Sequence, residues 1–274
     1  MMREKRINIT LIGYGNWGKK IYKNLKKISY INLKVFTKNN KIKNKNFRVL
    51  NRIADLDLDK LDGVVCATNA KIHEKIANIC IKNNVPAFIE KPISKKVNFF
   101  KDISVESKKR GIIVVNYIYL KYLVYKNFLP NLKKIKKKIL IFGSSNGEKD
   151  FRIIKWEWLT HIFAIVIFYF GNNIKNAEVK KRFNNFSLTF KILKIKFYCY
   201  FGDRFVKKTR FLKIIHKNKK KNQQFKLDNN FRPSLSPLNI VLKDFLNKIK
   251  KRLVYSDIDL SKKITKQIKN IKIN

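Results

Sequence analysis

The sequence predicts an α/β protein built from two domains, and three observations lead to this prediction. In the first part of the chain, apolar strand-like runs alternate with segments of helical periodicity, which is typical of a parallel sheet with crossover helices. In the second part, several strand-like runs follow one another without a helix between them, which indicates a mostly antiparallel open sheet. Hydrophobic residues make up 45% of the 274 residues, enough for a folded core. We expect one domain at 1–118 and an α+β domain at 119–274.

The first domain is expected to begin with a strand and to alternate from there. Ile21 and Leu25 lie one helical turn apart, so the helix after the first strand has an apolar face. Apolar runs such as GVVCA and VPAFI are typical of short buried strands. The expected strands are 7–12, 32–36, 63–67, 85–89 and 112–115, and the expected helices are 17–27, 73–81 and 95–110.

The second domain shows two helical segments among its strands. Apolar residues recur at helical spacing in 237–250, and a largely apolar helix is expected at 156–170. The most apolar run, from Trp158 to Phe170, is interrupted by His161 and falls short of the roughly 20 residues that span a bilayer, so we expect no membrane segment. The expected strands are 139–144, 186–190, 192–201 and 206–215.

The net charge of the chain is strongly positive. Lys and Arg total 64 against 18 Asp and Glu, which gives a formal charge of +46. Such a charge can attract nucleic acid. However, Lys, Asn, Ile, Phe and Tyr are encoded by A/T-rich codons, so compositional drift explains the charge without a polyanionic partner. We expect no specific nucleic-acid partner, and we expect the lysine runs at 133–138 and 217–221 to face solvent.

The cysteines and the N-terminus indicate the compartment. Cys66, Cys80 and Cys199 are far apart and form no CxxC pair, which excludes a disulfide scaffold and the usual zinc spacings. The first residues carry charges but no long apolar region, unlike a secretory signal. We expect a soluble cytoplasmic protein without a metal site.

A glycine motif follows the first strand and opens the first helix. In a GxGxxG loop the first glycine permits a tight turn, the second lets the backbone approach a pyrophosphate, and the third allows close packing of helix on strand. The phosphates then meet free N–H groups at the helix N-terminus. The motif therefore predicts a Rossmann domain that binds a dinucleotide, and a purely structural turn is the alternative. Its residues are Gly13, Tyr14, Gly15, Asn16, Trp17 and Gly18.

The end of the second strand bears on the choice between NAD and NADP. NAD-binding domains usually carry an acidic residue there for the ribose hydroxyls. No acidic residue occurs between Glu4 and Asp55. Thr37 and Lys38 could accept a 2′-phosphate instead, which favours NADP, although lysines are so common in this chain that Lys38 leaves NAD open.

Three segments of the first domain resemble one known family. The segments IGYGNWG, VCATNAKIHEKIA and AFIEKPIS are similar to those of the glucose–fructose oxidoreductase and inositol dehydrogenase (Gfo/Idh/MocA) family of NAD(P)-dependent oxidoreductases. The segments KKIKKKILIFG, WEWLTHIFAIVIFYFG and SPLNIVLKDFLNKIKK resemble its second domain, so the likeness covers nearly the whole chain. The resemblance implies that residues 119–274 serve substrate binding and oligomerisation.

The resemblance also implies roles for single residues. Lys91 matches a lysine that contacts the substrate hydroxyl beside the nicotinamide, and His161 matches the acid/base histidine of the catalytic helix. Glu157 lies one helical turn before His161 and is expected to orient it, whereas a packed core histidine is the alternative for His161. Near the cofactor the resemblance places Thr68, Asn69, His73, Glu90, Lys91 and Asn116.

Two positions depart from the family pattern. Ile162 stands where many relatives that use sugar nucleotides have an acidic residue, and Lys121 is the only cation where an arginine is often found. The resemblance nevertheless implies a cytoplasmic, homo-oligomeric NAD- or NADP-dependent dehydrogenase or reductase that acts on a CH–OH group of a sugar or polyol. A nucleotide-linked sugar of cell-surface polysaccharide biosynthesis is the expected substrate. The alternative is a catalytically degraded nucleotide- or polyanion-binding protein of the same fold.

Overall fold

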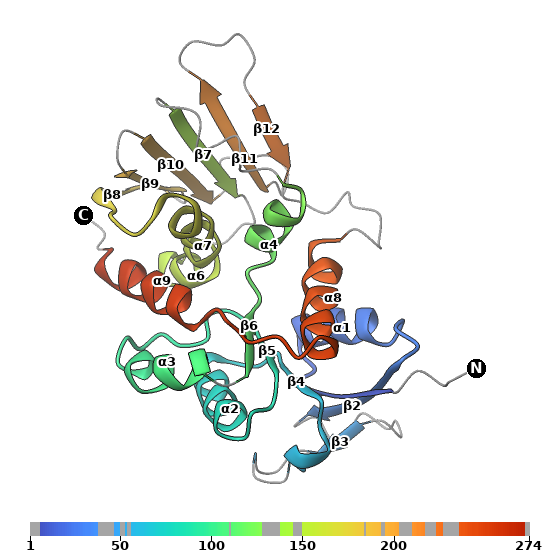
Figure 1. Cartoon of the computed structure of the whole chain (residues 1–274). Helices are drawn as coiled ribbons and strands as arrows, with labels where there is room; N and C mark the ends of the chain where they lie inside the picture. Colours follow the sequence, from blue (N-terminus) through green and yellow to red (C-terminus); the bar gives the residue numbers. More distant parts are fainter. Residues whose placement is uncertain are drawn as a thin grey trace. The chain divides into compact units, whose positions relative to one another are not determined.

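Two separate β-sheets organise the chain in the computed structural model (Figure 1). The structure describes residues 6–37, 47–49, 53, 56–109, 111–127, 138–144, 150–183, 185–192, 195–202, 210–216, 223–226 and 236–271. Contacts between Cα atoms divide the chain into two units. The first unit comprises Met1–Asn116 and Leu238–Lys262, and the second comprises Tyr117–Pro237 and Lys263–Asn274.

The first unit contains a seven-stranded parallel sheet with the strand order β13-β6-β5-β4-β1-β2-β3. The order reverses between β1 and β4, and open α/β sheets bind ligands outside the carboxyl ends of the strands at such a point. The strands are β1 (Ile7–Ile12), β2 (Ile31–Thr37), β3 (Phe47–Val49), β4 (Gly63–Cys66), β5 (Ala87–Ile89), β6 (Ile112–Val115) and β13 (Tyr255–Ser256).

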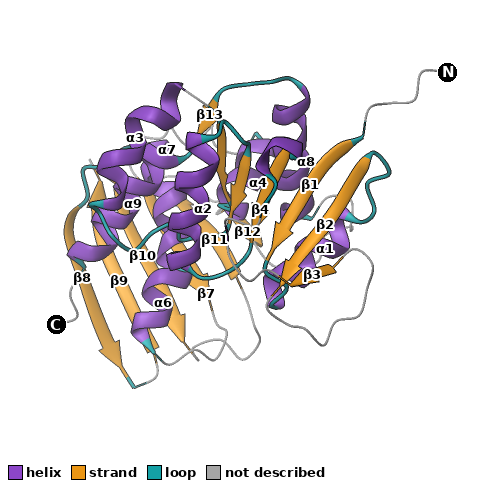
Figure 2. Cartoon of the chain, turned by 90° about the horizontal axis from the view of Figure 1, so that it is seen from below, coloured by secondary structure: helices purple, strands orange, loops and turns teal. Residues whose placement is uncertain are grey.

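Helices cover both faces of this sheet (Figures 1 and 2). On one face lie α1 (Asn16–Leu25) and α8 (Pro237–Lys250), and on the other lie α2 (Ala70–Lys82) and α3 (Phe99–Lys109). The ring of Phe245 in α8 lies 5.8 Å from that of Phe88 in β5. Every residue of β4, β5 and β6 is buried, as expected for strands covered on both sides. A short 3-10 helix, Leu58–Lys60, precedes β4.

The C-terminal part of the chain returns to the first sheet. Strand β13 pairs in parallel with β6, and the Asp257 carboxylate accepts a hydrogen bond of 2.9 Å from the buried Val115 N–H. Residues 238–262 therefore pack with the first unit. This division differs from the expected domains 1–118 and 119–274, because neither α8 nor β13 stays with the second sheet.

The second unit contains a six-stranded sheet with the order β12-β11-β7-β10-β9-β8. Only β7 and β10 pair in parallel among these strands, which confirms the predicted mostly antiparallel sheet. Alternate residues of β9, from Phe186 to Ile192, are buried under helices of the unit. The strands are β7 (Lys138–Ser144), β8 (Lys175–Arg182), β9 (Asn185–Ile192), β10 (Ile195–Gly202), β11 (Arg210–His216) and β12 (Gln223–Lys226).

The second unit contains three helices and the C-terminal half of a fourth among its described residues. They are α4 (Ile118–Tyr125), α6 (Phe151–Glu157), α7 (Leu159–Phe170) and residues 263–270 of α9 (Ile258–Asn270). Helices α6 and α7 meet at Trp158. The expected single helix at 156–170 is wrong near its start, because the helix is interrupted at Trp158. The Thr160 hydroxyl donates to the Trp156 carbonyl oxygen at 2.6 Å, and such a bond to the residue four positions back bends a helix.

The apolar character of this helix pair has a structural explanation. Among the described residues, Arg152–Phe170 is the one helical stretch long and apolar enough to cross a membrane, judged by length and composition alone. All residues from Leu159 to Ile167 are buried within the protein. The rings of Phe163 and Phe190 lie 5.6 Å apart, so α7 packs on the sheet as a core helix does.

Candidate functional site

The carboxyl ends of four neighbouring strands bring most of the predicted site residues of the first unit together. Cys66 lies opposite Ile12 on one side and Ile89 on the other, and Ile89 lies opposite Val115. The residues that come next along each strand therefore form one row at this edge of the sheet. That row consists of Gly13, Ala67, Glu90 and Asn116.

The glycine loop has the geometry that its three glycines predict. Gly13 adopts a φ of +96°, which favours glycine, and a Cβ atom there would overlap the Ala67 carbonyl oxygen. A Cβ atom on Gly18 would overlap the carbonyl oxygen of Gly13, so α1 approaches the loop closely. At Gly15 no described atom beyond its chain neighbours lies within 4 Å of a Cβ. The loop is open at the one glycine that would face a ligand.

The N-terminus of α1 suits an anion. Gly15 is its N-cap residue, no hydrogen bond from a described side chain caps it, and its first turn contains no acidic residue. Free N–H groups and the helix dipole favour a phosphate at such an end. In the same row, the Asn116 Oδ1 atom is fully buried and has no hydrogen-bond partner among the described residues. Open space, free donors and a buried acceptor together fit a dinucleotide.

Lys91 and Glu90 are buried charged residues at the end of β5. Lys91 is 7% exposed and Glu90 is 4% exposed. The Asn116 amide donates to the Glu90 carboxylate, and the Glu90 N–H donates to the Cys66 carbonyl oxygen at 2.9 Å. Open α/β sheets bind ligands outside the carboxyl ends of their strands, so a buried cation at the end of β5 supports a chemical role for Lys91.

His73 lies behind this row, in the first turns of α2. Its Nε2 atom accepts a hydrogen bond of 3.3 Å from the Thr68 N–H, and its Nδ1 atom lies 2.9 Å from the Pro92 carbonyl oxygen. Burial, followed by the nearby charge of Lys91, lowers the pKa of His73. The Asn69 side chain accepts from the Ile72 N–H at 3.2 Å and so caps α2.

The remaining residues predicted around the cofactor lie beside α1 and β2. The Tyr14 ring packs against Tyr22 and Phe47, with ring centroids 5.5 and 4.7 Å apart. The Trp17 ring lies 4.6 Å from the Lys20 ammonium. Thr37 is buried at the end of β2, and Lys38 lies outside the described residues. Asn16, the first residue of α1, is exposed.

The other two predicted catalytic residues belong to the second unit. His161 is 6% exposed, and its ring meets the edge of the Tyr119 ring at 4.8 Å. The stacked rings of Tyr119 and Trp158 lie 6.5 Å apart. Glu157 is exposed at the end of α6, whereas His161 is in α7. The two residues therefore do not share one uninterrupted helix.

Sequence reasoning missed Glu74 and Ser94. The Ser94 hydroxyl donates to the Glu74 carboxylate at 2.6 Å, which ties the loop after β5 to α2. The only sequence signal was position, because Glu74 follows His73 and Ser94 lies three residues after Lys91. Among the described residues, no group of three His, Cys, Asp or Glu side chains could hold a metal ion.

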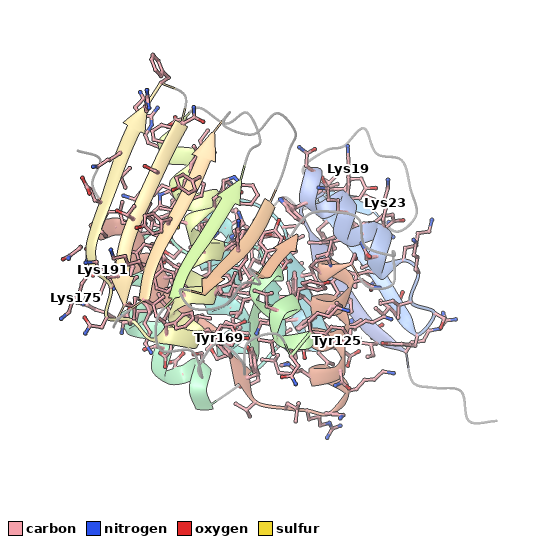
Figure 3. The ribbon with its side chains drawn as sticks, turned by 90° about the horizontal axis from the view of Figure 1, so that it is seen from above. Lys19, Lys23, Tyr125, Tyr169, Lys175 and Lys191 are labelled. Atoms are coloured by element: carbon pink, nitrogen blue, oxygen red, sulfur yellow. The ribbon has the colours of Figure 1, made fainter. Side chains whose placement is uncertain are left out.

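Exposed lysines lie on elements of both units. Lys19 and Lys23 project from α1, and Lys175 and Lys191 lie on β8 and β9 (Figure 3). Lys175 is directly opposite Lys191 in the sheet, and Lys191 is directly opposite Lys196. The predicted solvated runs at 133–138 and 217–221 lie outside the described residues except for Lys138.

Three solved structures that share this fold are bacterial oxidoreductases. Myo-inositol 2-dehydrogenase from Lactobacillus plantarum has a TM-score of 0.78 and 14% identity, covering 97% of this chain and 96% of its own. UDP-N-acetylglucosamine 3-dehydrogenase from Acidithiobacillus ferrooxidans has a TM-score of 0.74 and 14% identity, covering 97% of this chain and 96% of its own. A Gfo/Idh/MocA family oxidoreductase from Vibrio cholerae has a TM-score of 0.71 and 14% identity, with 95% of each chain covered. No curated protein matches the chain.

A family model identifies the first unit. Residues 7–117 match the model described as "Oxidoreductase family, NAD-binding Rossmann fold". The match covers the glycine loop and the Glu90–Lys91–Pro92 motif, and it confirms the predicted oxidoreductase class. Residues 7–117 thus match the NAD-binding Rossmann domain of the Gfo/Idh/MocA oxidoreductase family, in agreement with the resemblance seen in the sequence.

Proposed function

We propose that the protein transfers a hydride between a nicotinamide cofactor and a carbinol or keto carbon of a sugar or polyol. The observation that carries the proposal is the buried Lys91 at the carboxyl end of β5, on the same edge of the sheet as the open glycine loop. Ligands of open α/β sheets bind at this edge. A cation there can stabilise the negative charge that develops on a substrate oxygen.

The residues of the glycine loop would hold the diphosphate, with the N–H groups at the start of α1 as donors. Asn116 Oδ1, a buried acceptor in the same row, can receive a hydrogen bond from an amide of the cofactor. When bound, the cofactor supplies C4 of its nicotinamide ring as the hydride acceptor or donor.

Lys91 and His161 each have a proposed role at the substrate hydroxyl. In the oxidation direction, His161 accepts the hydroxyl proton while Lys91 stabilises the alkoxide. The Glu157 carboxylate supports the positive charge that His161 then carries. The two residues belong to different units, so each is tested by its own variant.

The cofactor is NAD or NADP, and the family match supports the NAD-binding fold. The end of β2 favours NADP in our proposal. Thr37 stands there instead of the acidic residue that binds the ribose hydroxyls in NAD-specific domains. A 2′-phosphate would meet no carboxylate of β2 itself.

The proposed substrate is a nucleotide-linked sugar used in cell-surface polysaccharide synthesis. This choice is supported by a structural neighbour that is a UDP-N-acetylglucosamine 3-dehydrogenase. We further propose a homo-oligomer, with residues 119–274 contributing to substrate binding and assembly. A cytoplasmic location agrees with three cysteines that are buried and unpaired.

Two measurements test the proposal. The first is titration of the purified protein with NADH and NADPH, followed by quenching of protein fluorescence, with mass spectrometry of any nucleotide that co-purifies. The second is turnover with UDP-N-acetylglucosamine and myo-inositol as probe substrates, followed by reduced nicotinamide absorbance. Saturable binding with turnover of either probe supports the proposal. A protein that binds neither nucleotide contradicts it.

A further inference from the structure

His73 is held between two loops by hydrogen bonds to both nitrogens of its ring. The Thr68 backbone N–H lies 3.3 Å from Nε2, and the Pro92 carbonyl oxygen lies 2.9 Å from Nδ1. A backbone N–H only donates, and a carbonyl oxygen only accepts. Nδ1 therefore carries the hydrogen and Nε2 accepts, so these partners select one neutral tautomer of the ring.

The two loops that His73 joins follow neighbouring strands. Thr68 follows β4 and Pro92 follows β5, and these strands pair in parallel with Cys66 opposite Ile89. Pro92 comes directly after Lys91, so His73 hydrogen-bonds to the carbonyl group of the residue that follows Lys91. The ring is only 1% exposed, so water does not compete for either hydrogen bond.

The backbone around Lys91 is fixed on both sides. On the N-terminal side, the Glu90 N–H donates to the Cys66 carbonyl oxygen at 2.9 Å. On the C-terminal side, the contact from His73 is followed by the 2.6 Å hydrogen bond from Ser94 to Glu74. The sheet therefore holds one side of Lys91, and two consecutive residues of α2 hold the other.

We propose that His73 is a positioning residue for Lys91. By tying the loop after β5 to the loop after β4, the neutral ring sets the place of the Lys91 backbone and hence of its ammonium group. Both ring nitrogens are used in this way, so His73 acts through the loop and not by contact with cofactor or substrate. The inference rests on the proposed function, since that function gives the place of Lys91 its chemical meaning.

Hydrogen exchange tests the structural half of the inference without any substrate. His73→Phe removes both hydrogen bonds and keeps a ring, whereas the amide of His73→Asn can still donate to Pro92. Ile76→Val is a matched control, because Ile76 is also buried in α2. Backbone amide exchange is measured on peptides that cover residues 91–98.

We expect faster exchange in His73→Phe, a rate close to wild type in His73→Asn, and no change in Ile76→Val. Unchanged exchange in His73→Phe would overturn the inference. An equal increase in Ile76→Val would also overturn it, because general loosening of α2 would then explain the effect.

A double-variant cycle tests the catalytic half. Rates are compared for His73→Phe, Lys91→Met and the double variant with the probe substrate that wild type turns over. A misplacement of about 1 Å can cost about 10²-fold in rate, so His73→Phe is expected to lose up to that factor. If His73 acts through Lys91, the double variant loses no more than Lys91→Met alone.

The outcomes separate the inference from the proposed function. Losses that multiply in the double variant contradict the positioning role and leave the role of Lys91 intact. A wild-type rate in Lys91→Met contradicts the proposed function of Lys91. In that case the exchange measurement still decides whether His73 holds the loop.

Discussion

A Cβ atom on Gly18 would overlap the carbonyl oxygen of Gly13. The start of α1 therefore lies directly against the turn that ends β1. Gly15, between the two, is different, because a Cβ there would meet no described atom within 4 Å beyond its chain neighbours. One glycine of the loop thus serves packing, and another leaves space for a ligand.

This difference predicts opposite effects for two similar variants. Gly15→Val is expected to keep the melting temperature of wild type and to abolish NADH binding, because its side chain occupies the space of the pyrophosphate. Gly18→Val is expected to lower the melting temperature by several degrees through backbone overlap. Thermal unfolding and fluorescence titration on both proteins check this. Nucleotide binding by Gly15→Val with wild-type affinity would show that the cofactor does not lie at this loop.

The pKa of His73 predicts a dependence of stability on pH. Burial lowers this pKa from the ordinary value of 6.5, and the charge of Lys91 adds to the effect. The unfolded ring then binds a proton more readily than the folded ring. The contribution of His73 to stability is full above about pH 6.5 and is lost as the pH falls through the lowered pKa. Urea unfolding from about pH 8 to about pH 5 should show a steeper loss for wild type than for His73→Asn, and equal slopes would contradict this assignment.

The lysine row on the second sheet predicts a stabilising substitution. Lys191 lies directly opposite both Lys175 and Lys196, and like charges in such pairs are destabilising. Lys191→Glu is expected to raise the free energy of unfolding by about 0.2–1 kcal/mol for each pair at low salt. Lys191→Gln, which removes the repulsion without adding attraction, should lie between. If Lys191→Glu is no more stable than Lys191→Gln, the row does not act through its charge.

The positive charge of the chain predicts salt-sensitive binding to nucleic acid. If the charge of +46 is compositional, any affinity rests on counterion release and not on base contacts. Binding to two unrelated DNA duplexes should be equal and should fall at least about tenfold between roughly 50 and 200 mM salt. Preference for one sequence that survives the higher salt concentration would instead favour a dedicated nucleic-acid protein.

The strands that could be predicted from sequence are those rich in buried apolar residues. β6 lies at the expected residues because it is apolar throughout, as is typical of buried parallel strands. β1 also lies at the expected residues, although Asn8 and Thr10 alternate with its apolar residues. β8 was missed because it is mostly exposed, with Val179 as its only buried residue. The pairing of β13 with β6 could not be predicted, since the Asp257–Val115 hydrogen bond spans 142 positions. α9 was also missed, although Ile264 and Ile268 are spaced as in a helix.

The site shows the same division between local and distant information. The glycine loop could be predicted because a strand, a turn and a helix follow one another in the sequence. The two partners of His73 could not, because the pairing of β4 with β5 brings Thr68 and Pro92 together. The single helix expected to carry Glu157 and His161 was wrong on a local detail, because α6 ends at Glu157 and α7 begins at Leu159.

The central claim is that Lys91 and His161 do chemistry, and paired measurements of rate and melting temperature on Lys91→Ala and His161→Ala test it most directly. Positioned acid–base groups contribute about 10²–10⁴-fold, so each variant should lose that much rate with little change in NADH affinity. His161 is buried beside Tyr119. If its role were only packing, His161→Ala would lower the melting temperature and leave the rate per folded molecule unchanged. Rates lowered in this range at a preserved melting temperature are the predicted result. A His161→Ala protein that is less stable but turns over at the wild-type rate per folded molecule would contradict the account.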